Sequence, residues 1–284
     1  MGNYSYTVFI ISHGSPSVCK TLDVLKSMNF NSEYFIVIDD EDSSIEEYKS
    51  NYNNLLIFEK RKYIEETETI MHPKNSCSAV YVKNFIEDYC QLNHIKAFII
   101  IDDDMKKLRY RYLENDKLKS CDIININSIF SEYVKYMIES DIDGLCFGMH
   151  TMYMNKVLEP NRRRFMSNIY FRNGKRKLNW VSQIYDDLNT CVYYSNYGHV
   201  YLMLPQIQME FEPQYFQIQN MNKNNFKNGG LTDLYNGYDS FKRAFLTTII
   251  QPSSAKPFLH KNVFLMSLSN DNTFPKIISH NYKK

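Results

Sequence analysis

Short apolar runs alternate with amphipathic segments through the first half of the chain. The apolar runs have the length of strands and lie at 6–12, 34–38, 54–58 and 97–101. Between them, Leu22, Leu25 and Met28 repeat at helical spacing within 18–28, and 77–92 is a longer amphipathic segment. Strands that alternate with helices through short connections are typical of βαβ units. This half of the chain therefore predicts a largely parallel α/β sheet.

The second half departs from this alternation. A β-hairpin is predicted from 168–171 to 176–181, because the Asn-Gly pair between them accepts the positive φ that tight hairpin turns require. Asp186 and Asp187 open a predicted helix that closes at Gly198. The other predicted elements are helices at 128–139 and 238–250, strands at 143–149, 199–204 and 263–268, and a polar, mobile loop at 206–227.

The composition is that of an ordinary folded protein, with 44% apolar and 23% charged residues among 284. Because no linker or internal repeat interrupts the pattern, a single domain spanning 1–284 is the economical interpretation. The 33 basic and 32 acidic residues leave a net charge of +1, so contact with nucleic acid would need a local basic patch.

The sequence predicts a cytoplasmic protein, because it has no apolar run of membrane-spanning length and begins with polar residues. Its abundance of Asn, Lys, Ile and Tyr indicates an AT-rich coding genome, as in a bacterium or an infecting phage. The six cysteines form no Cys-x-x-Cys pair and lie mostly in apolar segments, so we expect them to be reduced and buried, with no structural zinc site.

Three adjacent carboxylates, Asp102, Asp103 and Asp104, follow directly after the apolar run 97–101. Such a run predicts a buried strand that delivers the acids to the carboxyl edge of the sheet, where α/β proteins bind ligands. Carboxylates packed this closely repel one another, and a divalent cation such as Mg²⁺ or Mn²⁺ would relieve the repulsion. The alternative is a solvated turn in which one acid caps the next helix.

Two more acidic pairs accompany this triplet. Asp39 and Asp40 follow the second predicted strand, and a parallel sheet would bring them to the same edge as the triplet. Asp186 and Asp187 could reach that edge only through tertiary folding.

The order of these parts resembles that of GT-A type glycosyltransferases, whose Rossmann-like half binds a nucleotide sugar. The matching parts are the Ser-His-Gly-Ser loop at 12–15, the acids after the second strand, the Ile-Asp-Asp-Asp motif at 101–104 and the Tyr-Asp-Asp-Leu-Asn motif at 185–189. More narrowly, the pattern SAVYVKNFIEDYCQLNHIKAFIIIDDDM with the downstream NGGLTDLY is similar to the glycosyltransferases associated with TET/JBP-type modified-pyrimidine oxygenases. Many of those are phage-encoded and put a sugar on hydroxymethylated bases in DNA.

The resemblance implies a GT-A like single domain, in which 1–105 binds the nucleotide sugar and 106–284 binds the acceptor. The implied fold is a Rossmann-like, mostly parallel sheet with an antiparallel hairpin in its second half. The implied donor is a nucleoside-diphosphate sugar, with a UDP-sugar expected. Its contacts would come from Ser12, His13, Gly14, Asp39, Asp40, Lys83, Asn84, Asp102 and Asp103.

The metal and the catalytic base are implied in the same way. Asp102 and Asp104 would hold Mn²⁺ or Mg²⁺, while Asp187, with Asp186 beside it, would take the proton of the acceptor hydroxyl. Lys83-Asn84 stands where many relatives carry an Arg-Asn pair, so the positive charge is kept but the bidentate contact of a guanidinium with phosphate is lost. His13 stands where an arginine-containing turn is expected.

The acceptor would be DNA with modified bases. Gly229 and Gly230 would let it approach the backbone closely, and Arg162, Arg163 and Arg164 begin a basic cluster that extends to Lys177. Phe165, Tyr170 and Phe171, within the cluster, could stack on a base. A solvated basic hairpin and a flexible loop end are the alternative interpretations of these two segments.

The candidate donor and catalytic residues also have structural interpretations. Residues 12–14 could form a simple turn, and Asp40 could be a solvated acid at a strand end. Lys83 could be a surface lysine with its charge in water, and Asp186 or Asp187 could be a helix N-cap.

Two other functions compete with glycosyl transfer. A nucleotidyltransferase would also use carboxylate-bound Mg²⁺, but such enzymes usually begin with a glycine-rich loop that this chain lacks. A non-catalytic nucleic-acid-binding protein would have no use for a cleft of carboxylates.

Overall fold

A nine-stranded mixed sheet forms the centre of the part of the chain that the computed structural model describes, which is 4–17, 19–67, 78–149, 166–211, 240–252, 255–260 and 263–268. Its strands are β1 (Thr7–Ile11), β2 (Tyr34–Asp39), β3 (Leu55–Phe58), β4 (Ala97–Asp102), β5 (Met105–Glu114), β6 (Lys117–Asp122), β7 (Gly144–Met149), β8 (Ile169–Asn173) and β9 (Tyr201–Phe211). They lie in the order β3-β2-β1-β4-β8-β7-β9-β5-β6. A separate antiparallel pair, β10 (Ala255–His260) and β11 (Val263–Leu268), packs with the helix α9 (Ser240–Ile250).

The prediction of a parallel first half is confirmed. β3, β2, β1 and β4 pair in parallel, and β1 lies between β2 and β4. Alternate residues of these strands enter two different cores, because side chains of a strand point to opposite faces of the sheet. Val8 and Ile10 of β1 pack with α1 (Lys20–Ser27) and α5 (Ile126–Glu139), while Phe9 packs with α4 (Ala79–Leu92). Strands buried on both faces explain the unbroken apolar runs in the sequence.

The predicted hairpin of 168–171 with 176–181 is wrong. β8 instead lies between β4 and β7 and pairs antiparallel with both, while 176–181 contains no strand. Gly174, which the hairpin prediction used for its tolerance of a positive φ, instead allows a close approach of two backbone segments. A Cβ at this position would overlap the Ile95 carbonyl oxygen. The antiparallel strand expected in the second half is present, but at the middle of the sheet.

Two further expectations change in the second half. The polar segment predicted as a loop begins inside β9, which continues to Phe211, and the rest of that segment, 212–227, lies outside the described residues. The hairpin of β5 and β6 was not predicted at all. α6 (Asp186–Ser195) is confirmed, and Gly198 after it has a φ of 88°, as expected of a glycine that ends a helix.

The remaining expectations concern location and cysteines. Within the described residues, no helix combines the length and apolar character needed to cross a membrane. Cys19, Cys90, Cys146 and Cys191 are buried as predicted and form no disulfide, whereas Cys121 is exposed on β6. Cys77 lies outside the described residues.

A fully buried ion pair joins the sheet to α4. Arg172 Nε of β8 donates to Glu87 Oε1 at 2.7 Å, and both side chains have no exposed surface. Glu87 Oε2 also accepts from the Leu178 backbone N–H at 3.1 Å, and its other oxygen accepts from Trp180 Nε1 at 3.3 Å. The pair thereby fixes the irregular segment that leads from β8 to α6.

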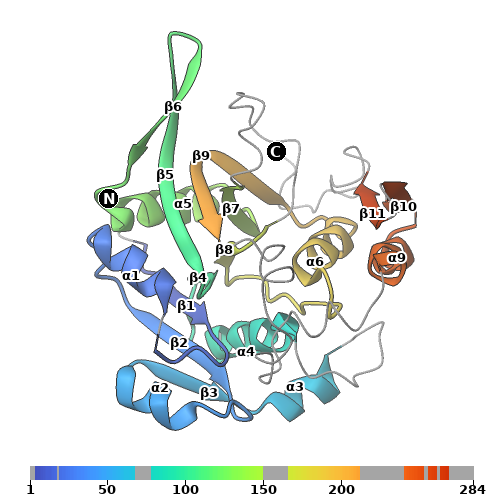
Figure 1. Cartoon of the computed structure of the whole chain (residues 1–284), viewed down its shortest axis with the longest axis horizontal. Coiled ribbons are helices and arrows are strands. Elements are labelled where there is room, and N and C mark those ends of the chain that lie inside the picture. The colour runs from blue at the N-terminus through green and yellow to red at the C-terminus, as the bar shows by residue number, and fades with distance from the viewer. Residues whose placement is uncertain are drawn as a thin grey trace.

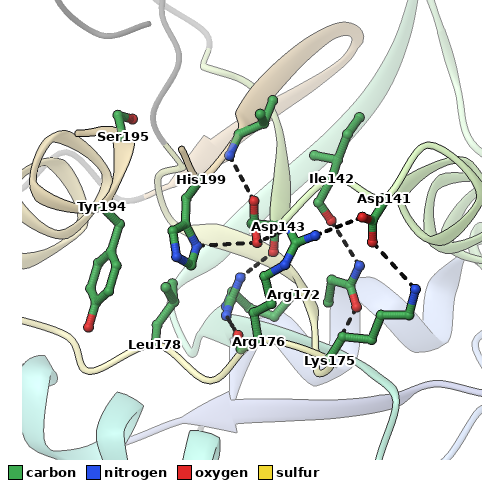
Figure 2. Close-up of polar contacts among 12 residues, drawn as sticks. Asp141, Ile142, Asp143, Arg172, Lys175, Arg176, Leu178, Tyr194, Ser195 and His199 are labelled. Carbon is green, nitrogen blue, oxygen red and sulfur yellow. Dashed lines mark hydrogen bonds and ion pairs between the residues drawn. The ribbon is translucent and has the colours of Figure 1, made fainter. Parts of the chain in front are cut away.

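A second buried acid, Asp143, lies just before β7 and contacts three residues from two other segments (Figure 2). Its Oδ1 lies 2.8 Å from Arg176 Nη1 and 3.2 Å from His199 Nδ1, and its Oδ2 accepts from the Val200 N–H at 2.8 Å. Burial raises the pKa of Asp143, but the contacts with His199, Val200 and Arg176 outweigh it and lower that pKa to about 2. Asp143 is therefore a stabilising carboxylate at neutral pH.

Asp143→Asn should lower the free energy of unfolding at pH 7 by about 2 to 3 kcal/mol, the equivalent of a pKa that falls from its ordinary value of about 3.9 to about 2. Because the folded-state pKa is depressed, this stabilisation is present above pH ~4 and is lost as the pH falls toward ~2. Urea unfolding across this range should show the wild type and the variant converging. The exposed Asp23→Asn should stay within about 0.5 kcal/mol of the wild type throughout.

Candidate active site

The loop after β1 lies directly beside the acidic triplet. Ser12 Oγ donates to Asp103 Oδ2 and also shares a hydrogen bond of 2.7 Å with Tyr48 Oη. Gly14 has a φ of 65°, which a glycine adopts without strain, and its N–H donates to Asp42 Oδ2 at 2.7 Å. The turn at 12–14 is thus held by carboxylates and a phenol.

The backbone of the triplet is fixed from the helix α1. Thr21 Oγ1 donates to the Asp102 carbonyl at 2.5 Å and accepts from the Met105 N–H at 3.0 Å. The Thr21 N–H donates to the Asp103 carbonyl at 3.1 Å. The alternative in which one of these acids caps the next helix is excluded, because β4 is followed directly by the strand β5.

Two of the three carboxylates, Asp102 and Asp103, lie in an environment that disfavours their charge. The pKa of Asp102 is raised to about 8, chiefly by burial and also by the charges of Asp104 and Asp103, although the charge of Lys83 lowers it. Burial likewise raises the pKa of Asp103 to about 6, although the Ser12 hydrogen bond opposes the shift. The residues around the triplet therefore leave its negative charge incompletely compensated.

These carboxylates fit a cation that is shared with a ligand. No group of three or more His, Cys, Asp or Glu side chains in the described residues has the geometry to hold a metal alone. Mg²⁺ commonly takes only one or two carboxylates and completes its shell with phosphate oxygens and water. Asp103 is engaged by Ser12 and Asp102 accepts weakly from Asn168 Nδ2 at 3.4 Å, so Asp102 and Asp104 stay the predicted ligands.

Asp39 and Asp40 end β2 on the side of the Ser12 loop. Asp39 Oδ2 lies 3.0 Å from His13 Nδ1, and Asp39 Oδ1 lies 3.3 Å from Lys60 Nζ. Burial raises the pKa of Asp39, yet His13 and Lys60 together lower it below its ordinary value. Asp40 accepts from the Lys60 N–H at 2.9 Å, at the start of the helix α3 (Lys60–Glu66). His13 and both acids therefore shape the loop, and their contact with a donor stays a prediction.

Lys83 is buried in the core and not a surface lysine. Its Nζ donates to Asp186 Oδ2 at 2.6 Å and to Tyr170 Oη at 3.0 Å. The same nitrogen lies 4.2 Å from the ring centroid of Tyr170 and 4.7 Å from that of Trp180. Burial lowers the pKa of Lys83, but Asp186, Asp102 and Asp187 outweigh burial and raise it, so the side chain is a buried cation.

The Asp186-Asp187 pair is thus linked to the acidic triplet through Lys83, whose charge interacts with Asp186 and with Asp102. Tertiary folding therefore brings the pair near the triplet. Tyr185 is the N-cap of α6 and has a φ of 53°, so neither Asp186 nor Asp187 is the N-cap; both lie in the first turn. Burial, followed by the charge of Asp186, raises the pKa of Asp187. Asp186 is occupied by Lys83, whereas Asp187 Oδ1 accepts from the Leu188 N–H at 2.7 Å.

Asn84 faces away from the acids. Its Oδ1 accepts from the Trp180 N–H at 2.7 Å, and its Nδ2 donates to the Trp180 carbonyl at 3.1 Å and to Thr67 Oγ1 at 3.0 Å. Asn84 also borders a cavity of about 400 Å³, which Tyr63 of α3 and Tyr193 of α6 line as well. Its amide supports the segment before α6, and its predicted contact with the donor is untested.

The predicted acceptor residues divide into two groups. Arg162, Arg163, Arg164, Phe165, Gly229 and Gly230 lie outside the described residues. In the described part of the basic cluster, Arg172 is buried on Glu87 and the other three residues pair with acids, while the side chains of Lys175 and Lys177 remain exposed to solvent in part. These pairs are Arg176 with Asp141 and Asp143, Lys175 with Asp141, and Lys177 with Asp88. Tyr170 and Phe171 are buried, so the expectation that they stack on a base is wrong.

Three residues of the site were missed by sequence reasoning. Tyr48 of α2 (Ile45–Asn51), Asp42 and Lys60 all hold the Ser12 loop or its acids. Only Asp42 had a local signal, because it extends the acidic run after the second strand.

The comparison with known families agrees with this architecture. The family model described as TET-Associated Glycosyltransferase matches residues 6–212, which include the Ser12 loop, the acidic triplet, Lys83 and the Asp186-Asp187 pair. No curated protein sequence matches the chain. The chain belongs to the TET-associated glycosyltransferase family and is an enzyme of the glycosyltransferase class.

Lys83→Met should lower the free energy of unfolding by about 3 kcal/mol or more, because it leaves the Asp186 carboxylate buried without its cation. Adding Asp186→Asn to that variant should recover part of the loss. Guanidinium unfolding of the wild type, both single variants and the double variant gives the coupling energy. Additive effects of the two substitutions would contradict the importance of the pair.

Proposed function

We propose that this glycosyltransferase transfers a sugar from a nucleoside-diphosphate donor to the hydroxyl of a hydroxymethylated pyrimidine in DNA, with Mg²⁺ or Mn²⁺ at Asp102 and Asp104. A UDP-sugar is the proposed donor. The observation that carries the metal and the donor is the crowding of carboxylates with raised pKa at the end of β4, beside the turn at 12–14. The family's association with TET-type oxygenases supports the acceptor.

The acidic edge is suited to a diphosphate only with a cation present, because phosphate and carboxylate repel each other. A bound divalent ion would supply charge neutralisation for the leaving diphosphate. Asp103 would act indirectly: its bond to Ser12 fixes the turn at 12–14 against the triplet. Asp39 and Asp40, at the end of the neighbouring strand β2, would hold the nucleoside part of the donor.

The second acidic pair would divide two tasks. Asp186 keeps Lys83 charged and in place, and this buried cation lies close enough to Asp102 to affect its pKa. Asp187 would take the proton from the acceptor hydroxyl. Its raised pKa is suited to that role, since a general base works best when its pKa approaches the working pH.

A donor panel separates this function from its competitors. The protein is incubated with Mn²⁺ and either hydroxymethylated or unmodified DNA, first with a set of nucleotide sugars and, in parallel, with nucleoside triphosphates. Release of a nucleoside diphosphate that depends on hydroxymethylated DNA supports the proposal. Release of pyrophosphate from a nucleoside triphosphate would indicate a nucleotidyltransferase, and DNA binding with no turnover of any donor would indicate a non-catalytic protein.

Mn²⁺ together with a nucleoside diphosphate should raise the melting temperature of the wild type, because both bind only the folded state. Asp102→Asn and Asp104→Asn should each abolish this rise. Neither should lower the melting temperature of the free protein much, since each relieves repulsion within the triplet. The matched control Asp116→Asn, at the tip of the β5–β6 hairpin, should keep the full rise. A wild type that does not respond to the two ligands would contradict the metal site.

Asp187→Asn should lower kcat by about 10²-fold or more, because the acceptor hydroxyl loses its base. The affinity for the donor should change by no more than a few fold, since the base acts on the acceptor. Steady-state kinetics and donor titration of the same preparation measure the two quantities. A collapse of donor affinity would instead assign Asp187 to the donor site.

A further inference from the structure

We propose that the β5–β6 hairpin is the surface on which the acceptor nucleic acid binds. This inference rests on the DNA acceptor proposed above and names the part of the molecule that would hold it. Figure 1 shows the hairpin projecting beyond the body of the sheet. β5 pairs with β9 from Met105 to Tyr110, and beyond that its outer half pairs, among the described strands, with β6 alone.

The hairpin concentrates positive charge. Residues 105–122 contain the basic residues Lys106, Lys107, Arg109, Arg111, Lys117 and Lys119 against the acidic residues Glu114, Asp116 and Asp122. Its net charge of +3 exceeds the +1 of the whole chain, so the remainder of the chain is net negative. A local basic surface of this kind is what a polyanion needs in an otherwise neutral protein.

Several charges of the hairpin are open to solvent: Lys106, Lys117 and Lys119 are exposed, while Arg109 and Arg111 are half-buried. Two of its ion pairs, Lys107 with Asp122 at 3.3 Å and Lys119 with Glu114, join side chains that are each more than a third exposed. Exposed pairs contribute little to stability, so phosphates can compete for these lysines. This contrasts with Arg172 and Arg176 of the predicted basic cluster, which are held by the buried acids Glu87 and Asp143.

Aromatic rings accompany the charges. Tyr110 and Tyr112 lie on the same face of β5, because they are two residues apart on a strand. Their rings stack with centroids 6.4 Å apart, and Tyr110 is 42% exposed. Lys119 lies opposite Tyr112 on β6. Tyrosines interleaved with lysines form a surface that accepts the flat faces of bases while it neutralises the backbone.

The hairpin starts at the acidic triplet. β5 begins at Met105, immediately after Asp104, and the Met105 N–H is tied to Thr21 Oγ1, which also holds the Asp102 carbonyl. At about 3.4 Å per residue, Tyr110 lies about 20 Å along the strand from Asp104. This distance is about two-thirds of one turn of duplex DNA, so a nucleic acid bound along β5 would also extend to the acidic triplet.

The ligand chemistry is a phosphodiester backbone with accessible bases. A two-stranded ribbon fits the major groove of duplex DNA, and stacked tyrosines fit a single strand. The test therefore uses both forms of one labelled, unmodified sequence, and it needs no sugar donor.

The first experiment is fluorescence anisotropy at several salt concentrations. The variant combines Lys107→Gln, Lys117→Gln and Lys119→Gln, and the control combines Lys26→Gln, Lys49→Gln and Lys62→Gln, which removes the same charge from exposed lysines of α1, α2 and α3. The hairpin variant should bind duplex at least about tenfold more weakly at low salt. The slope of log affinity against log salt should fall by about 2 to 3, since each lost phosphate contact removes about 0.9. The control should match the wild type within about twofold.

The second experiment separates base stacking from charge. Tyr110→Leu with Tyr112→Leu should weaken single-strand binding at least about fivefold, while the double Phe variant should restore it, because the stacking ring is retained. Equal binding by the Leu and Phe pairs would overturn the stacking role.

The outcomes also distinguish this inference from the proposed function. If the wild type binds DNA and the hairpin variant binds it with the same affinity, the hairpin assignment is overturned but the DNA acceptor is not. A wild type that binds neither form overturns the DNA acceptor as well. Circular dichroism of every variant checks that the fold is intact, and a change in oligomeric state without a change in DNA binding would make the hairpin a protein interface instead.

Discussion

Burial of charge is the constraint on which this structure depends. Lys83, Arg172 and Asp143 all lie in the interior, and each would be too costly there without a partner of opposite charge. Their partners come from distant segments: Asp186 for Lys83, Glu87 for Arg172, and Arg176 for Asp143. In the same order, the pairs join α4 to the start of α6, β8 to α4, and the residue before β7 to the segment after β8. The ion pair with Lys83 therefore ties the second acidic pair, Asp186 and Asp187, to α4.

The direction of the pKa shift distinguishes carboxylates whose charge is compensated by a cation from carboxylates whose charge is not. Asp143 and Asp39, which each contact a basic side chain, have a lowered pKa, whereas Asp102 and Asp103 have raised ones. Lys83 is shared among several acids and compensates only part of the triplet. The surplus negative charge at the end of β4 and the surplus positive charge on the β5–β6 hairpin thus lie next to each other along the chain. The proposed reaction needs two such adjacent surfaces of opposite charge: an acidic one that holds a cation for the diphosphate, and a basic one that attracts the nucleic acid.

The sequence predicts the parallel half well because its strands are buried on both faces and read as unbroken apolar runs. It predicts the position of β8 badly, because the same apolar run would suit a hairpin or an interior strand, and only tertiary packing decides. The β5–β6 hairpin was missed because closely spaced charged residues interrupt the apolar positions of both strands. Its signal is the two-residue turn Asn115-Asp116, with φ values of 51° and 58°, which is typical of tight hairpins. In the site, the acids were found from their position after strands. The contact of Lys83 with Asp186 joins residues 103 apart and has no local signature.

The order of strands in the sheet also bears on how the protein is made. β4 is complete early in the chain, but β8, which covers its open edge, is synthesised only after β5, β6, α5 and β7. Until then a nascent chain displays an apolar strand edge, the feature that most readily captures a neighbouring chain. Pairings between strands this distant in sequence also form slowly. Recombinant production should consequently benefit from slow synthesis at low temperature and from chaperones that shield strand edges, and fragments that end before β8 should aggregate.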